Sequence, residues 1–371
     1  LAAWYVRNEG LTSADPRKVA LADVLVRYWI GHAEALPSAD QARIESALIL
    51  EHFATATVAE LEPARVDAFV DWLRASGRSG GYIGRVLSTL RAALNWCHRR
   101  NELASVPFIR TVEPGEAYDR VLTPAQLARL WDAAEPVHLQ RFFMILSCCA
   151  ARPEAVPALR GRQGDLSYRR LDFNPPGRRQ TKKRRPVLPI CDTLLPWLQG
   201  FGAHAPDMPV IHVLQLEKPR AKGEDRRWVA KPLGSVRTAW RLMVARAIAT
   251  VRGEGAAEAH RLRGFGDRIG AWATIARAKA EAAGLDGIMP KTVRHTAGTE
   301  LRARSVPEWE AAGFMGHRTM YKTTEIYAKY RPDYLAAATR AIDAWWQEIA
   351  ALTHRRSGRR SRCVPVACQA G

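Results

Sequence analysis

The chain has 371 residues and a formal net charge of +19, from 56 Lys and Arg residues against 37 Asp and Glu residues. At 47% hydrophobic and 25% charged residues it can build folded cores, which argues against a disordered polyelectrolyte. No stretch approaches the roughly 18–20 apolar residues of a membrane span, and the first ten residues do not form a secretory signal, so we expect no membrane partner. The excess positive charge either aids solubility alone or indicates a polyanionic partner, with nucleic acid the first candidate.

The cysteine pattern predicts neither a metal site nor a disulfide framework. None of the six cysteines forms a CxxC pair, and no His pair has zinc-finger spacing. A GxxxxGK[ST] phosphate loop is also absent from the sequence, so we expect no cofactor. We interpret the cysteines as reduced thiols of a cytoplasmic protein, with Cys148 and Cys149 facing a core.

The first third of the chain has helical periodicity. Ser38 is a candidate N-cap, Pro63 suits a first helical turn, and Ser79 precedes a third helix. The expected apolar stripes are Ile44, Ala47, Leu48 and Leu50; Val66, Phe69, Val70 and Leu73; and Ile83, Val86, Leu87, Leu90, Leu94 and Cys97.

The third of these helices has a basic face opposite its apolar stripe. A face of this kind is either an ordinary solvated surface or a surface that contacts DNA phosphates. The basic residues are Arg85, Arg91, Arg99 and Arg100.

Residues 111–120 are polar, contain Pro and Gly, and lack periodicity, which predicts an interdomain linker. Residues 160–189 then change to short, turn-rich, strand-like sequence around Asn174-Pro175-Pro176-Gly177, which predicts a small antiparallel sheet with a hairpin. This hairpin region is strongly basic, so it is either a solvated face or a DNA-contacting element. Its candidate contact residues are Arg178, Arg179, Lys183, Arg184 and Arg185, beside Lys182.

Four separated pieces of sequence become informative together. They are ARPEAVPAL around Arg152, the basic hairpin with Lys182, KTVRHTAGTEL around Arg294, and MGHRT followed by TTEIYAKY, with His317 and Tyr327. Taken singly, each piece could have a purely structural role, such as forming an ion pair or supplying a core side chain. In order and spacing the set resembles the tyrosine recombinase (phage integrase) family, over roughly residues 20–345.

The resemblance implies a mainly α fold with a small antiparallel β-sheet (α+β) and the family's domain order. The expected segments are an N-terminal segment 1–19, a helical core-binding (DNA-binding) domain 20–110, the linker 111–120, a catalytic domain 121–350, and a basic, disordered tail 351–371.

The resemblance also implies a site-specific recombinase or integrase that cleaves and rejoins DNA through a 3′-phosphotyrosyl intermediate. Tyr327 would be the nucleophile, Arg152 and Arg294 would clamp the phosphate, and His317 would donate a hydrogen bond to it. Lys182 would protonate the leaving 5′-oxygen, with Lys183 as its rival.

The chain departs from the family pattern at three places. Lys291 stands where the family has the first histidine of HxxR, and we keep it as a catalytic candidate. The acidic residue of the first box usually lies three positions after the arginine. In this chain that position is Ala155, and the acidic residue is Glu154, one position earlier. The spacing from His317 to Tyr327 is one residue longer than usual, which leaves Tyr321 and Tyr330 as weaker nucleophile candidates.

The last expected helix carries Trp345 and Trp346 and either docks on its own domain or packs onto a neighbouring protomer. The family resemblance implies the second arrangement, a homotetramer assembled on double-stranded DNA. It also allows an accessory DNA-bending protein as a further partner. Two alternatives stay open, a catalytically degenerate DNA-binding relative and a type IB topoisomerase. We expect the protein to be cytoplasmic and associated with the nucleoid.

Overall fold

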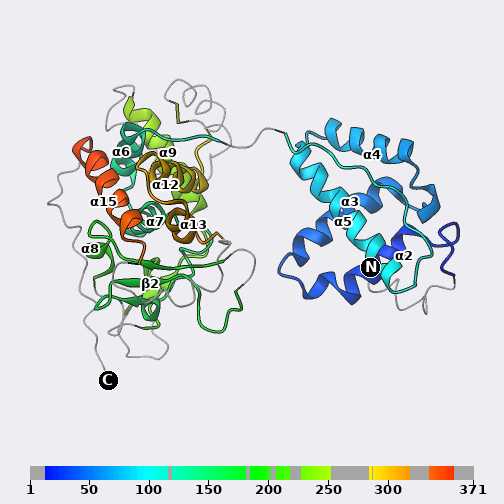
Figure 1. Cartoon of the computed structure of the whole chain (residues 1–371), viewed down its shortest axis with the longest axis horizontal. Helices are drawn as coiled ribbons and strands as arrows, with labels where there is room; N and C mark the ends of the chain where they lie inside the picture. The colour runs from blue at the N-terminus through cyan, green and yellow to red at the C-terminus, as the bar shows by residue number, and fades with distance from the viewer. Residues whose placement is uncertain are drawn as a thin grey trace. The chain divides into compact units, whose positions relative to one another are not determined.

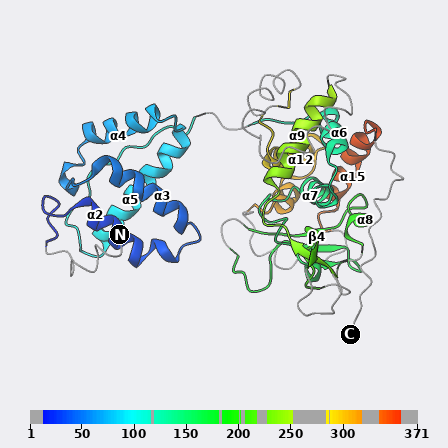
Figure 2. The same cartoon turned by 180° about the vertical axis from the view of Figure 1, so that it is seen from behind.

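The chain divides into two compact units, Leu1–Tyr118 and Asp119–Gly371. Figures 1 and 2 show both from opposite sides, and each is described by itself below. The boundary falls within the segment predicted as a linker. The computed structural model describes residues 13–115, 119–180, 184–199, 201, 206–217, 227–251, 284–285, 287–317 and 334–354.

Unit 1 is a bundle of helices built around α5 (Gly80–Arg99), which packs against the other three long helices. The predicted stripes of α4 and α5 are buried as expected, from Val66 to Leu73 and from Ile83 to Cys97. Ser79 caps α5 by accepting a hydrogen bond from the Tyr82 amide at 3.3 Å. The other elements of unit 1 are α2 (Leu21–Gly31), α3 (Ala39–Phe53), α4 (Pro63–Ala75) and the 3-10 turns Ala33–Ala35 and Val58–Glu60.

The predicted apolar stripe of α3 is half right, because Leu48 and Leu50 pack against the core, whereas Ile44 and Ala47 are exposed. Ile44 is 48% exposed, whereas Glu45 is 2% exposed and faces the bundle. The Glu45 carboxylate accepts hydrogen bonds from the Thr89 hydroxyl at 2.6 Å and from the Gln41 amide at 2.9 Å, and lies 3.4 Å from the Arg85 guanidinium. These partners satisfy a buried charge, which would otherwise be costly, and so they fix the rotation of the helix.

The start of the predicted linker is bound to unit 1 rather than free. Residues 112–114 pass over the glycine-rich first turns of α5, where a Cβ on Gly80 would clash with the Glu113 carbonyl oxygen. The Arg91 guanidinium donates to the carbonyl oxygens of Ile109 and Arg110, both at 3.2 Å. Arg91, a predicted DNA contact, therefore also braces this segment against α5.

Unit 2 combines helices with two small antiparallel sheets, which confirms the predicted α+β class (Figure 2). The helix α7 (Val137–Cys148) lies in the core, and the predicted capping box forms at the start of α6 (Pro124–Ala133), between Thr123 and Gln126. The other described helices of this unit are α8 (Leu195–Leu198), α9 (Arg237–Val251), α12 (Pro290–Ala303), α13 (Glu308–Met315) and α15 (Ala336–Ala351).

The predicted hairpin region forms a three-stranded sheet in the order β1-β2-β3, with Leu171 paired to Leu188 and both buried. Its strands are β1 (Gly164–Asp165), β2 (Arg170–Asp172) and β3 (Val187–Pro189). A second sheet of β4 (His212–Glu217) and β5 (Arg227–Pro232) was not predicted.

The helix α15 docks on its own unit. Trp345 is fully buried and Trp346 is 4% exposed, and Trp346 makes an edge contact with Trp131 of α6 at a centroid distance of 5.7 Å. The described apolar face of α15 is therefore covered within one chain by α6, α12 and α13, and the expected contact of this helix with a neighbouring protomer stays a prediction. The predicted tail lies outside the described residues, apart from its first four positions.

None of the described helices has the length and apolar character needed to cross a membrane. The four described cysteines are unpaired and buried, and they include Cys148 and Cys149 as predicted. In the part of the chain that the structure describes, no cluster of three His, Cys, Asp or Glu side chains is arranged to hold a metal ion.

Candidate active site

Arg152 is delivered by the turn that ends α7. The helix stops at Cys148, Ala150 adopts a left-handed conformation with φ 42°, and the Ala151 amide donates back to the Leu146 carbonyl at 3.2 Å. This is the hydrogen-bond pattern of a helix C-terminus that normally uses glycine. Alanine in this conformation costs about 1 kcal/mol, so the surrounding core must hold the turn in place.

Arg294 reaches the same turn from α12. It lies in the second turn of that helix, which Pro290 begins, and the preceding Thr292 and Val293 are fully buried. Its guanidinium donates to the carbonyl oxygen of Ala150 and, at 2.7 Å, to that of Met315. One side chain therefore joins the start of α12 to the ends of α7 and α13.

His317 follows α13 and is fixed by a glycine. Gly316 caps the helix in a left-handed conformation with φ 66°, and the His317 amide donates to the Ala312 carbonyl at 2.8 Å. The His317 Nε2 lies 3.5 Å from a guanidinium nitrogen of Arg294. The capping geometry thus places the imidazole against the second arginine.

The segment that leaves the hairpin packs directly on this glycine. A Cβ on Gly316 would lie 2.8 Å from both the Arg184 carbonyl oxygen and the Cδ of Pro186. Arg152 ties the two pieces together, since it donates to the Arg184 carbonyl oxygen and, at 3.4 Å, to that of Gly316. Gly316 is therefore needed both for its positive φ and for the close approach of the hairpin.

Burial and neighbouring positive charges lower the pKa values of the residues at the site. Burial and the neighbouring Arg152 lower the pKa of Arg294 to about 10, and burial lowers the pKa of Arg152 as well. Burial, Arg294 and Arg152 together lower the pKa of His317, which favours a neutral imidazole at neutral pH. Glu154 opposes the shifts of both arginines. Electrostatic repulsion between two converging guanidiniums beside a neutral imidazole indicates a site for an anion.

Each arginine keeps donors for such an anion. A guanidinium has five N–H groups, and the carbonyl bonds described above use two of them on each residue. Carbonyl oxygens also hold a guanidinium without neutralising its charge. The arrangement can therefore bind the oxygens of a phosphate with preorganised, charged donors.

The structure brings together three of the six predicted catalytic residues, Arg152, Arg294 and His317. Lys291 lies one turn before Arg294 on α12, and its side chain is exposed. Lys182, Lys183 and Tyr327 lie outside the described residues, as do the alternative nucleophiles.

The acidic residue of the first box lies near both arginines from its early position. Ala155 is buried at 3% exposure, whereas the exposed Glu154 is near enough to raise the pKa values of Arg152 and Arg294. The sequence could have suggested this role, because Glu154 is the only acidic residue of that box.

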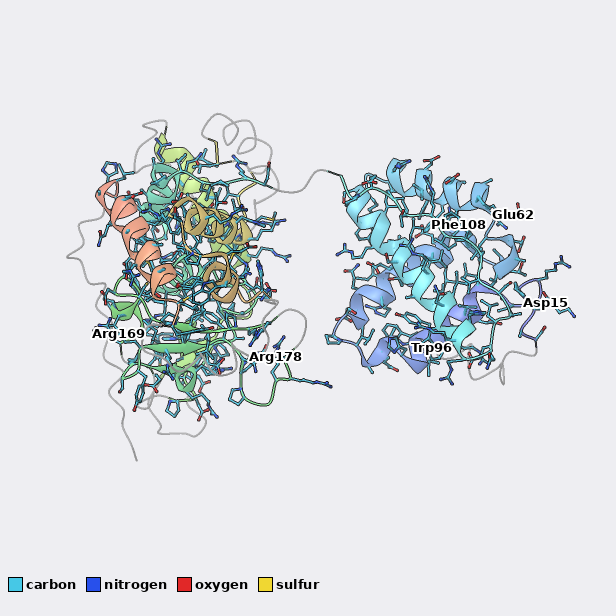
Figure 3. All side chains as sticks on the ribbon, in the orientation of Figure 1. Asp15, Glu62, Trp96, Phe108, Arg169 and Arg178 are labelled. Atoms are coloured by element: carbon cyan, nitrogen blue, oxygen red, sulfur yellow. The ribbon has the colours of Figure 1, made fainter. Side chains whose placement is uncertain are left out.

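The predicted DNA-contacting arginines fall into two groups. On α5, Arg85 is paired with Glu45, and Arg100 lies 3.1 Å from the Glu102 carboxylate. In unit 2, Arg179 is exposed, and Arg178 donates to the Asn174 side chain at 2.9 Å. Figure 3 shows Arg178 on the loop that extends from the sheet, on the opposite side of the unit from Arg169. The remaining predicted contacts are Arg91, Arg99, Arg184 and Arg185.

Comparison with solved structures identifies the fold. The chain is similar to the Tn1549 transposon integrase in complex with transposon right end DNA, with a TM-score of 0.55 and 12% identity over 87% of this chain and 99% of that chain. It is also similar to a lambda integrase dimer bound to a COC′ core site, with a TM-score of 0.52 and 13% identity over 83% of this chain and 77% of that one. The chain has the tyrosine-recombinase fold. No family model and no curated protein matches its sequence.

A third similar structure is a lambda integrase tetramer bound to a Holliday junction, with a TM-score of 0.51 and 13% identity over 88% of this chain and 80% of that one. At these identities the tyrosine-recombinase fold is what the chains share. The activity of this chain must be argued from its own residues.

Proposed function

We propose that this protein is a site-specific DNA recombinase that cleaves and rejoins DNA through a 3′-phosphotyrosyl intermediate. One observation carries the proposal. Arg152, Arg294 and His317 come from three separate segments of the chain. Hydrogen bonds from the two guanidiniums to backbone carbonyl oxygens, together with the left-handed Gly316, bring them to one anion site. The fold shared with DNA-bound integrases supports it.

In this reaction the Tyr327 hydroxyl oxygen attacks phosphorus and gives its proton to solvent water, and the bond from phosphorus to the 5′-oxygen breaks. Lys182 gives its proton to the departing 5′-oxygen, and the phosphotyrosyl link conserves the energy of the phosphodiester. Arg152 and Arg294 stabilise the extra negative charge of the transition state on the non-bridging oxygens, and His317 donates a hydrogen bond to them. Rejoining reverses each step, with a 5′-hydroxyl of the partner strand as the nucleophile.

Lys291 is proposed to bind phosphate rather than to act as a base. Its position one turn from Arg294 on α12 suits a contact with the DNA backbone beside the scissile phosphate. The substitution Lys291→Ala separates these roles, because a lost backbone contact weakens binding, whereas a lost base slows cleavage at saturating protein.

Strand exchange requires more than one copy, and we propose four copies on two duplexes, as in the lambda integrase tetramer bound to a Holliday junction. Because the apolar face of α15 is used within unit 2, we propose that the copies contact each other through surfaces other than this face.

The test uses a pool of nicked duplexes with randomised sequence, in which cleavage near the nick releases a short strand and traps the covalent product. Protein-linked DNA is isolated under denaturing conditions and sequenced, which also reveals the target site. The proposal predicts an enriched sequence and an adduct that disappears in Tyr327→Phe but persists in Tyr321→Phe and Tyr330→Phe.

Two outcomes would overturn the proposal. Sequence-specific binding without any adduct would indicate a degenerate DNA-binding relative. Adducts without sequence enrichment, together with relaxation of supercoiled plasmid, would indicate a topoisomerase.

A further inference from the structure

The main chain of Arg185 is held in a fixed position beside the candidate active site. Its backbone is held from both sides by the Gln180 side chain, which accepts from the Arg185 amide at 3.0 Å and donates to the Arg185 carbonyl oxygen at 2.8 Å. Its neighbours in sequence are Arg184, whose carbonyl oxygen binds Arg152, and Pro186, which packs on Gly316. The main chain at Arg185 is therefore fixed against the two segments that carry the anion site.

The side chain of Arg185 borders two adjoining pockets. The first is lined by Arg152, Arg185 and Arg294 over an apolar floor that includes Phe173 and Phe314. The second shares Arg185 and Pro186 with the first and is also lined by His317. Arg185 therefore lines one pocket together with Arg152 and Arg294 and the adjoining pocket together with His317.

The environment of Arg185 favours an anion. Its side chain is half-buried, and burial, Arg178 and Arg152 all lower its pKa, against which only Glu154 acts. Among the described residues, no acidic side chain forms a salt bridge with Arg185. A desolvated guanidinium beside like charges raises the free energy of the unliganded protein, and a bound anion would offset this.

We propose that Arg185 is a third guanidinium that binds the scissile phosphate, and thus a catalytic residue rather than a general DNA contact. The inference rests on the function proposed above. Arg152 and Arg294 each use two donors on backbone carbonyls, whereas Arg185 is held by its backbone, which leaves its side-chain donors for the phosphate.

The experiment measures single-turnover cleavage of the nicked duplex at saturating protein. The substrate carries either a natural scissile phosphate or a methylphosphonate, in which a neutral methyl group replaces one charged oxygen. Arg185→Ala should slow cleavage of the phosphate about ten- to a hundredfold, because one charge-assisted contact to the transition state is lost. On the methylphosphonate the loss should shrink to less than about threefold, because less charge needs stabilising.

The matched control is Arg169→Ala, an exposed arginine directly before β2 that is paired with Asp192 and is not among the predicted DNA contacts. It should leave both the protein concentration needed for half-maximal binding and the saturated rate unchanged. Arg185→Lys should recover part of the rate, because it keeps the charge without the planar fork.

Three results would overturn the proposal. Equal losses on the two substrates would make Arg185 a positioning residue, and weaker binding with an unchanged saturated rate would make it an ordinary backbone contact. A lower urea midpoint in both Arg185 variants, together with lost cleavage, would indicate a structural role. Wild-type adduct formation in the same gel reports on the proposed function separately, so the two claims can fail independently.

Discussion

The basic face of α5 and the arginines of the candidate active site contain similar numbers of cations but differ in how these are used. On α5 the guanidiniums are spread along one helix, and Arg85 and Arg100 are paired with carboxylates. In unit 2, Arg152, Arg185 and Arg294 converge on one pocket, and the first and third are held by carbonyl oxygens. Convergence without neutralisation, rather than the number of charges, distinguishes a phosphate-binding site from a basic surface.

The largest effect is expected for Arg294. Arg294→Ala removes a charged donor from the anion site and the link among α7, α12 and α13, so cleavage at saturating protein should fall about 100- to 1,000-fold. Arg294→Lys should restore little, because an ammonium cannot reproduce the planar, multi-donor geometry. Single-turnover adduct formation measures both.

The control for Arg294 lies just beyond the end of the same helix. Arg304 contacts the carboxylates of Glu300 at 3.4 Å and Glu348 at 2.8 Å. Arg294 instead contacts the carbonyl oxygens of Ala150 and Met315. Arg304→Ala should lower the free energy of unfolding by about 1 kcal/mol or less and leave cleavage unchanged. A comparable loss of cleavage in Arg304→Ala would show that destabilising this part of unit 2 is enough to stop cleavage. That result would contradict the role assigned to Arg294 in binding the phosphate.

The next largest effect is expected for Gly316. Gly316→Ala forces an L-residue into a left-handed conformation and brings its Cβ against the Arg184 carbonyl and Pro186. We expect a loss of about 1–3 kcal/mol in the free energy of unfolding, with slower cleavage because the hairpin segment moves away from His317. Urea denaturation and adduct formation report the two effects.

Gly77 provides the matched comparison, because it has φ 74° and a Cβ at this position would have no neighbouring atom within 4 Å. Gly77→Ala should show only the conformational cost, about 1 kcal/mol, and normal cleavage. Equal behaviour of the two variants would mean that the close approach at Gly316 contributes nothing.

The smallest effect is expected on α5. Arg85→Ala removes an exposed partner of Glu45, so it should weaken DNA binding modestly and lower the free energy of unfolding by less than about 1 kcal/mol. Cleavage at saturating protein should not change. The binding constant should also become less dependent on salt concentration, by about one unit of log–log slope if the residue contacts a phosphate. An unchanged slope would remove Arg85 from the DNA-contacting set.

Local sequence signals predicted much of the fold. The stripes of α4 and α5 and the capping box at Thr123 depend on residues within one or two turns, so spacing alone was sufficient. The stripe of α3 could not be predicted in this way, because the inward position of Glu45 depends on Thr89, 44 residues further along the chain. The β4–β5 sheet was missed although Pro219 and Gly223 lie between its strands, because neither strand has a strict apolar–polar alternation.

The candidate site was predictable in its residue types but not in its geometry. The order of the motifs identified Arg152, Arg294 and His317, which the structure places together. Nothing in the sequence distinguishes Arg185 from its basic neighbours, because its role depends on the pocket beside it. The double requirement for Gly316 likewise comes from a segment about 130 residues earlier.

Mapping the residue that carries the DNA shows whether Tyr327 is the nucleophile of a site that depends on Arg294. Protein-linked DNA from wild-type protein and from Arg294→Ala is digested with nuclease and protease, and the peptide that retains a nucleotide is sequenced by mass spectrometry. We expect a nucleotide on Tyr327 through a 3′-phosphate, with yield lost in Arg294→Ala. A nucleotide on another residue, or an undiminished yield in Arg294→Ala, would contradict this expectation.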